Sequence, residues 1–338
     1  MLAKTMFILL LAGFLLYAPA CKKEINPPPP PPPDTLFTRI PGTEALSTMG
    51  MVPLPDNALL VLLTAHTGVF KVTADGIQAI PAFADKNILS LWRQGNDLYL
   101  LENRLEVYYA LKVNITTFEI VEETEVGAGH HIMVNDDGII YVIKQLTSIL
   151  GSNAILKRTQ EDSTQSFNVP GGSNTFLFAG YYVLDYEFDS AGQPVLGTTE
   201  NSIYAFNAQD SFEYINGPVL NAHIRAFALD QADTPWFLLG PVIFIRDDPY
   251  WESYEIPVEP GNIYTDAVNL QLQPGRIWTI GEGLISRWQN INQPPETWSE
   301  PFANSSTPDQ RIREGLVNDQ ERVWVSTLDG IYYSDKMK

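Results

Sequence analysis

Apolar and polar positions alternate along this chain in short runs that polar turns interrupt. The pattern is clearest at the C-terminal end, where the polar turn at Asp319 to Arg322 precedes the apolar run Val323 to Ser326, and a second turn at Leu328 to Gly330 precedes Ile331 to Tyr333. Turn residues between apolar runs of this length are typical of β-hairpins. No stretch after the N-terminal segment keeps a period of 3.6 residues, so we expect helices to be short at most.

The same hairpin recurs upstream. Positions equivalent to Trp324, each in an apolar strand that follows a polar turn, are Val61, Tyr99, Tyr141, Val195, Trp236, Trp278 and Trp324. A further strand follows each of these anchors, and then a segment that often ends in proline, as in IQAIP (77–81) and SYEIP (253–257). Proline at a strand end suits an edge strand, because a central strand would lose a hydrogen bond there. Each unit therefore has four strands, with the proline-ended one outermost.

Four short strands in a unit of about 40 to 45 residues match one blade of a β-propeller. The seven anchors predict an all-β, seven-bladed propeller of four-stranded blades. The seventh unit stops one strand short, and Thr35 to Pro41 carries the Ile-Pro ending of the outer strands. We therefore expect this N-terminal strand to complete the last blade and close the ring. A pair of β-sandwiches is the alternative, but it explains neither the regular spacing nor the shared outer-strand ending.

Two of the units carry a family resemblance. VNDQERVWVSTLDGIYYSD and LQPGRIWTIGEGLISRW resemble the propeller repeats in the sensor domains of hybrid two-component regulators, in which a D-x-x-G turn precedes an apolar Trp strand and a T-x-x-G-[LIV]-[YF] step. The other units match this pattern loosely. The resemblance implies a propeller, and it implies little about function because propeller repeats serve many unrelated functions.

The N-terminal segment has the features of an export signal. Lys4 precedes the apolar run Met6 to Ala18, which is short for a membrane span, and Ala18-Pro19-Ala20-Cys21 resembles the lipobox of bacterial lipoproteins. An ordinary signal with a chance cysteine is the alternative. Seven prolines, Pro27 to Pro33, follow and would form an extended, semi-rigid spacer.

These features predict three regions: a lipoprotein signal peptide (1–20), a lipid-anchored proline-rich stalk (21–34) and the propeller (35–338). Cys21 is the predicted lipidation site, and membrane lipid is one predicted partner. We expect the protein in the cell envelope, as an outer-membrane lipoprotein on the periplasmic or surface face.

Charge and cysteine content narrow the function. The chain has 40 acidic and 21 basic residues, for a net charge of −19, and its folded part has no Lys/Arg cluster. Nucleic acid is therefore not an expected partner, because phosphate binding needs clustered positive charge. The single cysteine excludes an intrachain disulfide and any metal site built from several cysteines. No nucleophile elbow, zincin, Walker or Rossmann motif occurs, and we expect no cofactor and a monomer.

In a propeller the innermost strands line a central channel, and the loops that enter them form one rim. Counting back from the anchors brings charged residues from five blades to this mouth. The predicted ligand-binding residues are His130, His131, Asp185, His223, Arg225, Asp266 and Arg313. Mixed charges in one concavity would bind a polar ligand, although the same groups could instead pair with one another and only hold the ring together.

Three of these residues also raise the question of a metal. His130, His131 and His223 could contribute to an open metal site. Adjacent residues of a strand point to opposite faces, however, so at most one of the first two faces the channel, and we predict no metal site. Tyr181, Tyr182 and Tyr264 lie near the predicted mouth and would suit a sugar.

The leading hypothesis is a membrane-anchored binding or scaffold module that presents its mouth to a protein or to a small polar ligand such as a glycan. The rival is an axial-site enzyme, similar to streptogramin lyase or the metal-dependent lactonases, in which a channel-mouth cation and a His or Asp act on a ring ester. His130, His131, His223, Asp185 and Asp266 supply suitable groups, but they match no site motif of those families. We therefore assign no catalytic residue.

Overall fold

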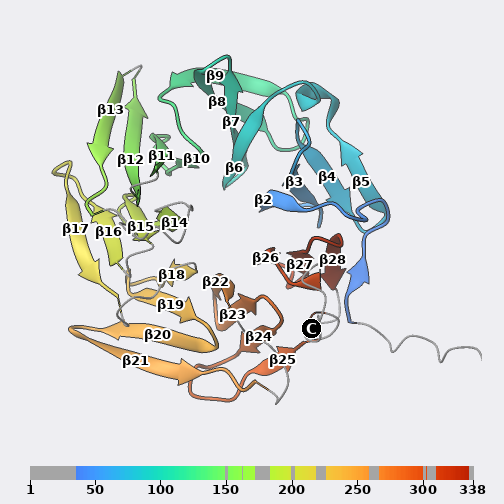
Figure 1. Ribbon diagram of the computed structural model, residues 1–338, viewed down its shortest axis with the longest axis vertical. Helices are drawn as coiled ribbons and strands as arrows, with labels where there is room; N and C mark the ends of the chain where they lie inside the picture. The colour runs from blue at the N-terminus through green and yellow to red at the C-terminus, as the bar shows by residue number, and fades with distance from the viewer. Residues whose placement is uncertain are drawn as a thin grey trace, which may run out of the picture. The chain divides into compact units, whose positions relative to one another are not determined.

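Seven antiparallel four-stranded sheets surround a common axis in the computed structural model, and the chain forms them in sequence order (Figure 1). The structure describes residues 36–148, 151–161, 163–171, 183–198, 202–217, 226–258, 266–299, 302 and 310–334. The predicted all-β, seven-bladed propeller is confirmed. Among these residues, helix is limited to short 3₁₀ turns such as η1 (Pro81–Phe83).

Each blade runs outward from the channel in four strands. The innermost strands are β2 (Thr48–Pro53), β6 (Ile88–Gln94), β10 (His131–Val134), β14 (Val183–Phe188), β18 (Phe227–Leu229), β22 (Ala267–Gln273) and β26 (Glu314–Val317). The second strands are β3 (Leu59–Leu63), β7 (Asp97–Arg104), β11 (Ile140–Ser148), β15 (Pro194–Thr198), β19 (Pro235–Leu239), β23 (Arg276–Gly281) and β27 (Val323–Ser326). All seven predicted anchors lie in these second strands.

The third strands are β4 (Phe70–Thr73), β8 (Val107–Asn114), β12 (Gly151–Gln160), β16 (Ser202–Phe206), β20 (Val242–Asp247), β24 (Ile285–Trp288) and β28 (Ile331–Ser334). The outermost are β5 (Gly76–Ala79), β9 (Ile120–Val126), β13 (Ser163–Asn168), β17 (Phe212–Asn216), β21 (Tyr250–Glu255), β25 (Glu296–Trp298) and, for the last blade, β1 (Thr38–Arg39). The proline-ended segments are thus edge strands, as predicted.

The N-terminal strand closes the ring. Thr38 of β1 pairs with Tyr333 of β28, and the N–H of Ile40 donates to the carbonyl of Ile331 at 2.9 Å. Phe37 and Ile40 are buried beside this pairing. The prediction that the first strand completes the seventh blade is confirmed from Leu36 onward, while Thr35 lies outside the described residues.

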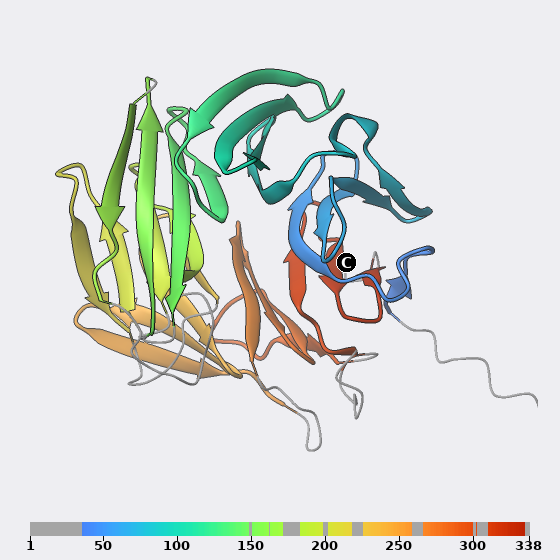
Figure 2. The ribbon, with the colours of Figure 1, turned by 45° about the horizontal axis from the view of Figure 1, so that its top comes forward.

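The core lies between neighbouring blades rather than within any one of them. Each cluster of buried side chains combines residues of two adjacent sheets, as where the third and fourth blades pack face to face (Figure 2). Trp278 packs against the seventh blade and Trp324 against the first, and both are fully buried. Six of the seven anchors therefore recur because each fills the gap to the following blade.

One anchor is wrong by one residue. Val61 packs with Trp324, toward the preceding blade, whereas its neighbour Leu60 packs toward the following blade. Leu60 is therefore the residue of blade one that corresponds to Tyr99 in blade two. A shift of one residue moves a strand side chain to the opposite face, and both residues are buried Leu or Val, so composition could not distinguish them.

Four innermost strands carry a β-bulge near their start. The register shifts by one residue around Met49, Leu89, Leu184 and Val268. A bulge leaves one residue unpaired and bends the strand, and it often re-aims side chains near functional sites. The repetition of the bulge in blades one, two, four and six makes it part of the repeat.

Candidate functional site

Seven equivalent positions of the innermost strands form one ring of residues, which we call the channel layer. Each lies opposite a residue of the second strand in its own blade. That partner residue comes two positions after the anchor, which is Leu60 in the first blade. The channel layer consists of Gly50, Ser90, His131, Asp185, Ala226, Asn269 and Glu314. Five of the seven residues are polar, so a polar ring lines an otherwise apolar fold.

Side chains of the channel layer join each innermost strand to the next. Ser90 Oγ accepts a hydrogen bond from the N–H of Ile132 at 3.2 Å, and Asp185 Oδ2 accepts one from the N–H of Phe227 at 2.8 Å. Asn269 Nδ2 donates to the carbonyl of Gly315 at 2.7 Å. Three residues of different chemistry thus perform the same structural role in different blades.

A second set of bonds repeats this arrangement two residues further along the strands. Trp92 Nε1 donates to the carbonyl of Val134 at 2.9 Å, and Glu187 Oε2 accepts from the N–H of Leu229 at 2.7 Å. Gln271 Oε1 accepts from the N–H of Val317 at 2.6 Å. Buried backbone groups need such partners, so these side chains stabilise the ring.

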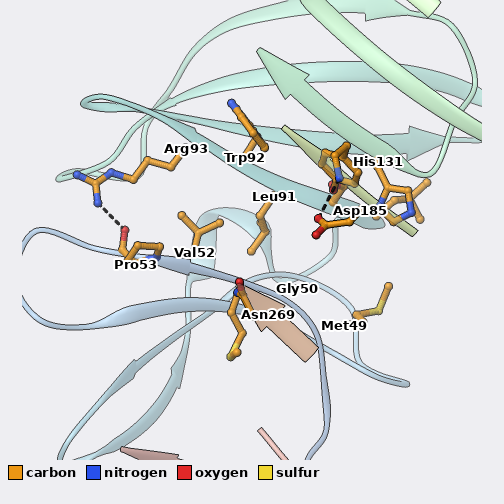
Figure 3. A pocket seen from close by; sticks show the side chains of 14 residues that line it. Met49, Gly50, Val52, Pro53, Leu91, Trp92, Arg93, His131, Asp185 and Asn269 are labelled. Atoms are coloured by element: carbon orange, nitrogen blue, oxygen red, sulfur yellow. Dashed lines mark hydrogen bonds between the residues drawn. The ribbon is translucent and has the colours of Figure 1, made fainter. Parts of the chain in front are cut away.

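A cavity of about 390 Å³ lies on the axis of the ring, and we call it the channel pocket (Figure 3). Five innermost strands line it: β2, β6, β10, β14 and β22. Its lining residues are Met49 to Pro53, Leu89 to Arg93, His131, Asp185, Tyr186 and Asn269. Figure 3 shows His131 and Asp185 at one end and Arg93 at the other, where Arg93 donates to the carbonyl of Pro53 at 2.9 Å.

Three carboxyl groups on the innermost strands have raised pKa values. Burial raises the pKa of Asp185 to about 7, although the N–H groups of Phe227 and Tyr186 partly offset this effect. Burial likewise raises the pKa values of Glu187 and Glu314 to about 7. Uncharged carboxyl groups are therefore substantially populated in the channel at neutral pH.

Histidine shifts in the opposite direction. Burial lowers the pKa of His131 to about 4, and His130 contributes to the decrease. The pKa of His130 is also lowered, by burial and by Lys144. Both imidazoles are thus neutral at physiological pH and can accept hydrogen bonds.

A second cavity of about 320 Å³, the rim pocket, lies beside the channel pocket. It is lined by Leu184, Asp266, Ala267, Val268, Glu282, Ile312 and Arg313. The Glu282 carboxylate, in a residue only 8% exposed, lies 3.5 Å from Arg311 Nη1 and 3.7 Å from Arg313 Nη1. The two pockets adjoin at β14, because Leu184 lines one and Asp185 the other.

The predicted mouth residues are divided between these pockets. His131 and Asp185 line the channel pocket, and Asp266 and Arg313 line the rim pocket. His130 lines neither of them: its Nδ1 accepts a hydrogen bond from the N–H of Gln145 at 3.0 Å. His223, Arg225, Cys21, Tyr181, Tyr182 and Tyr264 lie outside the described residues.

Sequence reasoning missed Ser90, Asn269 and Glu314, which share the channel layer with His131 and Asp185. Aligning the repeats by the innermost strand would have found them, since Ser90 and His131 are 41 residues apart in adjacent units. The prediction located each innermost strand only by its first residues, and the bulges displace those residues by one position.

In the described ranges, no group of three or more His, Cys, Asp or Glu side chains is placed to hold a metal ion. Over the same part of the chain, no helix has the length and apolar character needed to cross a membrane.

Solved structures share the fold across most of the chain. Virginiamycin B lyase from Staphylococcus aureus matches with a TM-score of 0.63 and 12% identity, covering 88% of this chain and 97% of the lyase. YCF48 bound to D1 peptide matches with a TM-score of 0.59 and 12% identity, covering 88% and 94%.

The extracellular domain of the putative hybrid two-component system BT4673 from B. thetaiotaomicron matches with a TM-score of 0.58 and 13% identity, covering 89% of this chain and 40% of that one. The resemblance to sensor propellers of two-component systems is thereby seen in three dimensions. No protein-family model and no curated protein matches the chain. At these identities the likeness shows the fold alone.

Proposed function

We propose that this protein is an envelope lipoprotein, anchored through Cys21, whose propeller mouth binds a protein or a small polar ligand such as a glycan. The mouth comprises His130, His131, Asp185, His223, Arg225, Asp266 and Arg313. The lipid anchor is supported by the export signal, the small residues before Cys21 and the proline stalk that follows.

The observation that carries the binding function is the pair of adjoining pockets. Their volumes of about 390 and 320 Å³ fall in the range of small-ligand sites, and each combines apolar walls with a few polar groups. The rim pocket also presents Asp266, Glu282 and Arg313 together, so a partner with charges of both signs can be bound there.

The shared fold gives this function precedents. YCF48 is a propeller that was solved with a peptide bound, and the BT4673 propeller is the extracellular part of a signalling protein. Both support a role in recognition at a protein surface or outside the cell, although fold alone does not determine function.

The test compares wild type with an Asp266→Asn/Arg313→Ala variant. Full-chain proteins are applied to a glycan array and to labelled envelope proteins, and their melting temperatures are measured. We expect the variant to lose at least tenfold in affinity for the ligand found, with a melting temperature within about 2 °C of wild type. Arg158→Ala is the matched control, because Arg158 pairs with Asp210 near the outer edge of blades three and four. If the variant retains full affinity, the mouth is not the binding site.

An axial-site enzyme of lyase or lactonase type is the second candidate. It is favoured by the structural match over 97% of virginiamycin B lyase, a protein that has also been crystallised in inactive form with quinupristin. Incubation of the full chain with quinupristin and a divalent cation, followed by liquid chromatography and fragmentation mass spectrometry, tests it. Hydrolysis of the ring ester adds the mass of one water, whereas elimination opens the ring at unchanged mass and alters the retention time and the fragments. Either product supports an enzyme, and quinupristin with unchanged mass, retention time and fragments after prolonged incubation rejects this substrate.

A further inference from the structure

The channel pocket has an apolar side formed by bulged and inward-facing residues. Met49, the bulged residue of β2, is 49% exposed, and it lines the pocket with Leu89, Leu91 and Trp92. Exposed methionine beside an aromatic ring is a surface that adapts to apolar groups of varied shape. This side of the pocket therefore favours a ligand with an apolar body.

The opposite side of the pocket offers mainly hydrogen-bond acceptors. Asp185 Oδ1 accepts from the N–H of Tyr186 at 2.9 Å and Oδ2 accepts from the N–H of Phe227, which leaves lone pairs on both oxygens. Asn269 uses one N–H of its amide Nδ2 to donate to Gly315, and its Oδ1 is an acceptor available to a ligand. The hydrogen bonds between blades thus leave acceptor atoms of Asp185 and Asn269 on this side of the cavity.

No cationic side chain of the lining lies next to the Asp185 carboxyl group. Arg93 is the only Lys or Arg among the lining residues that the structure describes. Its guanidinium points away from Asp185 and donates to the carbonyl oxygens of Pro53 and Gly95 (Figure 3). A ligand at this end of the pocket would therefore meet a carboxyl group whose charge the lining does not neutralise.

We propose that the channel pocket binds a small organic ammonium cation, with its ammonium group on Asp185 and Asn269 and its apolar body against Met49 and Trp92. This inference rests on the proposed function, because it assigns a ligand class to part of the mouth. The ammonium group supplies three N–H donors and a charge, which match the acceptors and the carboxyl group. A cation near the Trp92 ring is also stabilised electrostatically.

Other ligand classes fit the pocket less well. An anion would enter a channel whose innermost strands carry Asp185, Glu187 and Glu314. A neutral sugar would bring no positive charge to an ionised Asp185 carboxyl group. The Asp185 carboxyl group and the apolar wall together favour a cation with an apolar substituent.

Binding of a cation should be linked to proton release. The pKa of Asp185 is raised by burial, and an ammonium group beside it favours the ionised form. The titratable groups around Asp185 are His131 from β10, Tyr186 and Glu187 on β14, and Glu314 from β26. Of these, His131 is neutral across pH 6 to 8, so it does not obscure the proton that Asp185 releases.

The experiment uses the full chain and three probes of one shape: benzylammonium, benzyl alcohol and benzoate. Isothermal titration calorimetry at pH 7 in two buffers of different ionisation enthalpy gives both the affinity and the number of protons released. We expect benzylammonium to bind at least tenfold more tightly than benzyl alcohol, with benzoate weakest, and to release protons on binding. Methylammonium should bind at least fivefold more weakly than benzylammonium, because it lacks the apolar body.

Asp185→Asn and Glu187→Gln form a matched pair. Each amide oxygen can still accept the N–H of the next blade, but only residue 185 lines the pocket. We expect Asp185→Asn to lose at least tenfold in benzylammonium affinity together with the proton release, and Glu187→Gln to stay within twofold of wild type. If Asp185→Asn does not fold, the three-probe comparison on wild type still decides the proposal.

Equal affinity for all three probes, tighter binding of benzoate, or full benzylammonium affinity in Asp185→Asn would overturn the cation site. The proposed function fails separately, since it depends on the Asp266→Asn/Arg313→Ala variant. If the rim variant loses partner binding while wild type does not bind benzylammonium, the protein is a binding module and the cation proposal is wrong.

Discussion

The carboxyl group of Asp185 accepts a hydrogen bond from the backbone N–H of Phe227 at 2.8 Å, across the boundary between the fourth and fifth blades. The same side chain lines the channel pocket. One residue therefore both joins two sheets and faces the cavity, so a loss of binding in a variant at this position must be separated from a loss of stability. An asparagine at this position can keep the bond from Phe227 through its amide oxygen, but the N–H of Tyr186 then loses its acceptor, so the melting temperature of the variant is measured together with its affinity.

Stability should depend on pH through the channel carboxyl groups. Asp185, Glu187 and Glu314 have pKa values of about 7 in the folded protein, above their ordinary values near 4. Between pH 4 and 7 the unfolded chain ionises first, so the folded state loses stability as pH rises through this window and stays less stable above it.

An Asp185→Asn/Glu187→Gln/Glu314→Gln variant removes this dependence. The melting temperature of wild type should fall from pH 5 to pH 8. The melting temperature of the variant should fall less over the same interval, by roughly 2 °C or more for each carboxyl group. His131 is present in both proteins, so its own titration cancels. Thermal unfolding at the two pH values measures the difference, and an unchanged difference contradicts the raised pKa values.

Gln145 clamps the third blade to the fourth. Its Nε2 donates to the carbonyl of Val183 at 2.7 Å and its Oε1 accepts from the N–H of the same residue at 3.2 Å. Gln145→Leu leaves both buried backbone groups without these partners and should lower the free energy of unfolding by about 2 to 4 kcal/mol. Gln94→Leu is the control, because Gln94 pairs with Asp136 at an exposed position and should cost under about 0.5 kcal/mol. Urea unfolding compares the two, and equal costs would rule out the clamp.

The N-terminal strand should be essential to the ring. A chain that begins at Gly42 lacks β1 together with the buried side chains of Phe37 and Ile40, and it leaves β28 as an open edge. We expect it to melt at least about 10 °C below a chain that begins at Leu36. Ile40→Ala in the full chain should cost about 2 to 5 kcal/mol. Identical melting of the two truncated chains would show that the strand is dispensable.

Cys21 is predicted to be the lipidated first residue of the mature protein. Mass spectrometry of the membrane-extracted protein should find a lipid-modified N-terminal cysteine, and Cys21→Ser should release a folded protein from the membrane fraction. An unmodified thiol, or cleavage at another bond, would exclude the lipoprotein assignment. The melting temperature of the released variant serves as the control for folding.

The order of the strands could be derived from the sequence because each blade repeats a local pattern. Polar turns, apolar runs and proline-ended edges are set within about 45 residues, so Trp278 and Trp324 fell in the correct strands, and the seventh unit visibly lacked its outer strand. The likeness of the Thr35 to Pro41 segment to the outer strands then sufficed to predict that it pairs with β28.

Three-dimensional packing decided what the local pattern could not. Whether Leu60 or Val61 faces the next blade depends on how β3 packs against the neighbouring sheets, because a shift of one residue moves a strand side chain to the opposite face and both residues are apolar. The channel layer likewise results from seven registers at once, so Ser90, Asn269 and Glu314 can be assigned to the layer of Asp185 only when the innermost strands of the repeats are aligned with their bulges. The repeat, the strand order and the ring closure could be predicted from the sequence, since these follow from turn chemistry and apolar periodicity. Which side chains meet in the channel depends on the relative register of strands that are about 40 residues apart, and that register is known only once the chain is folded.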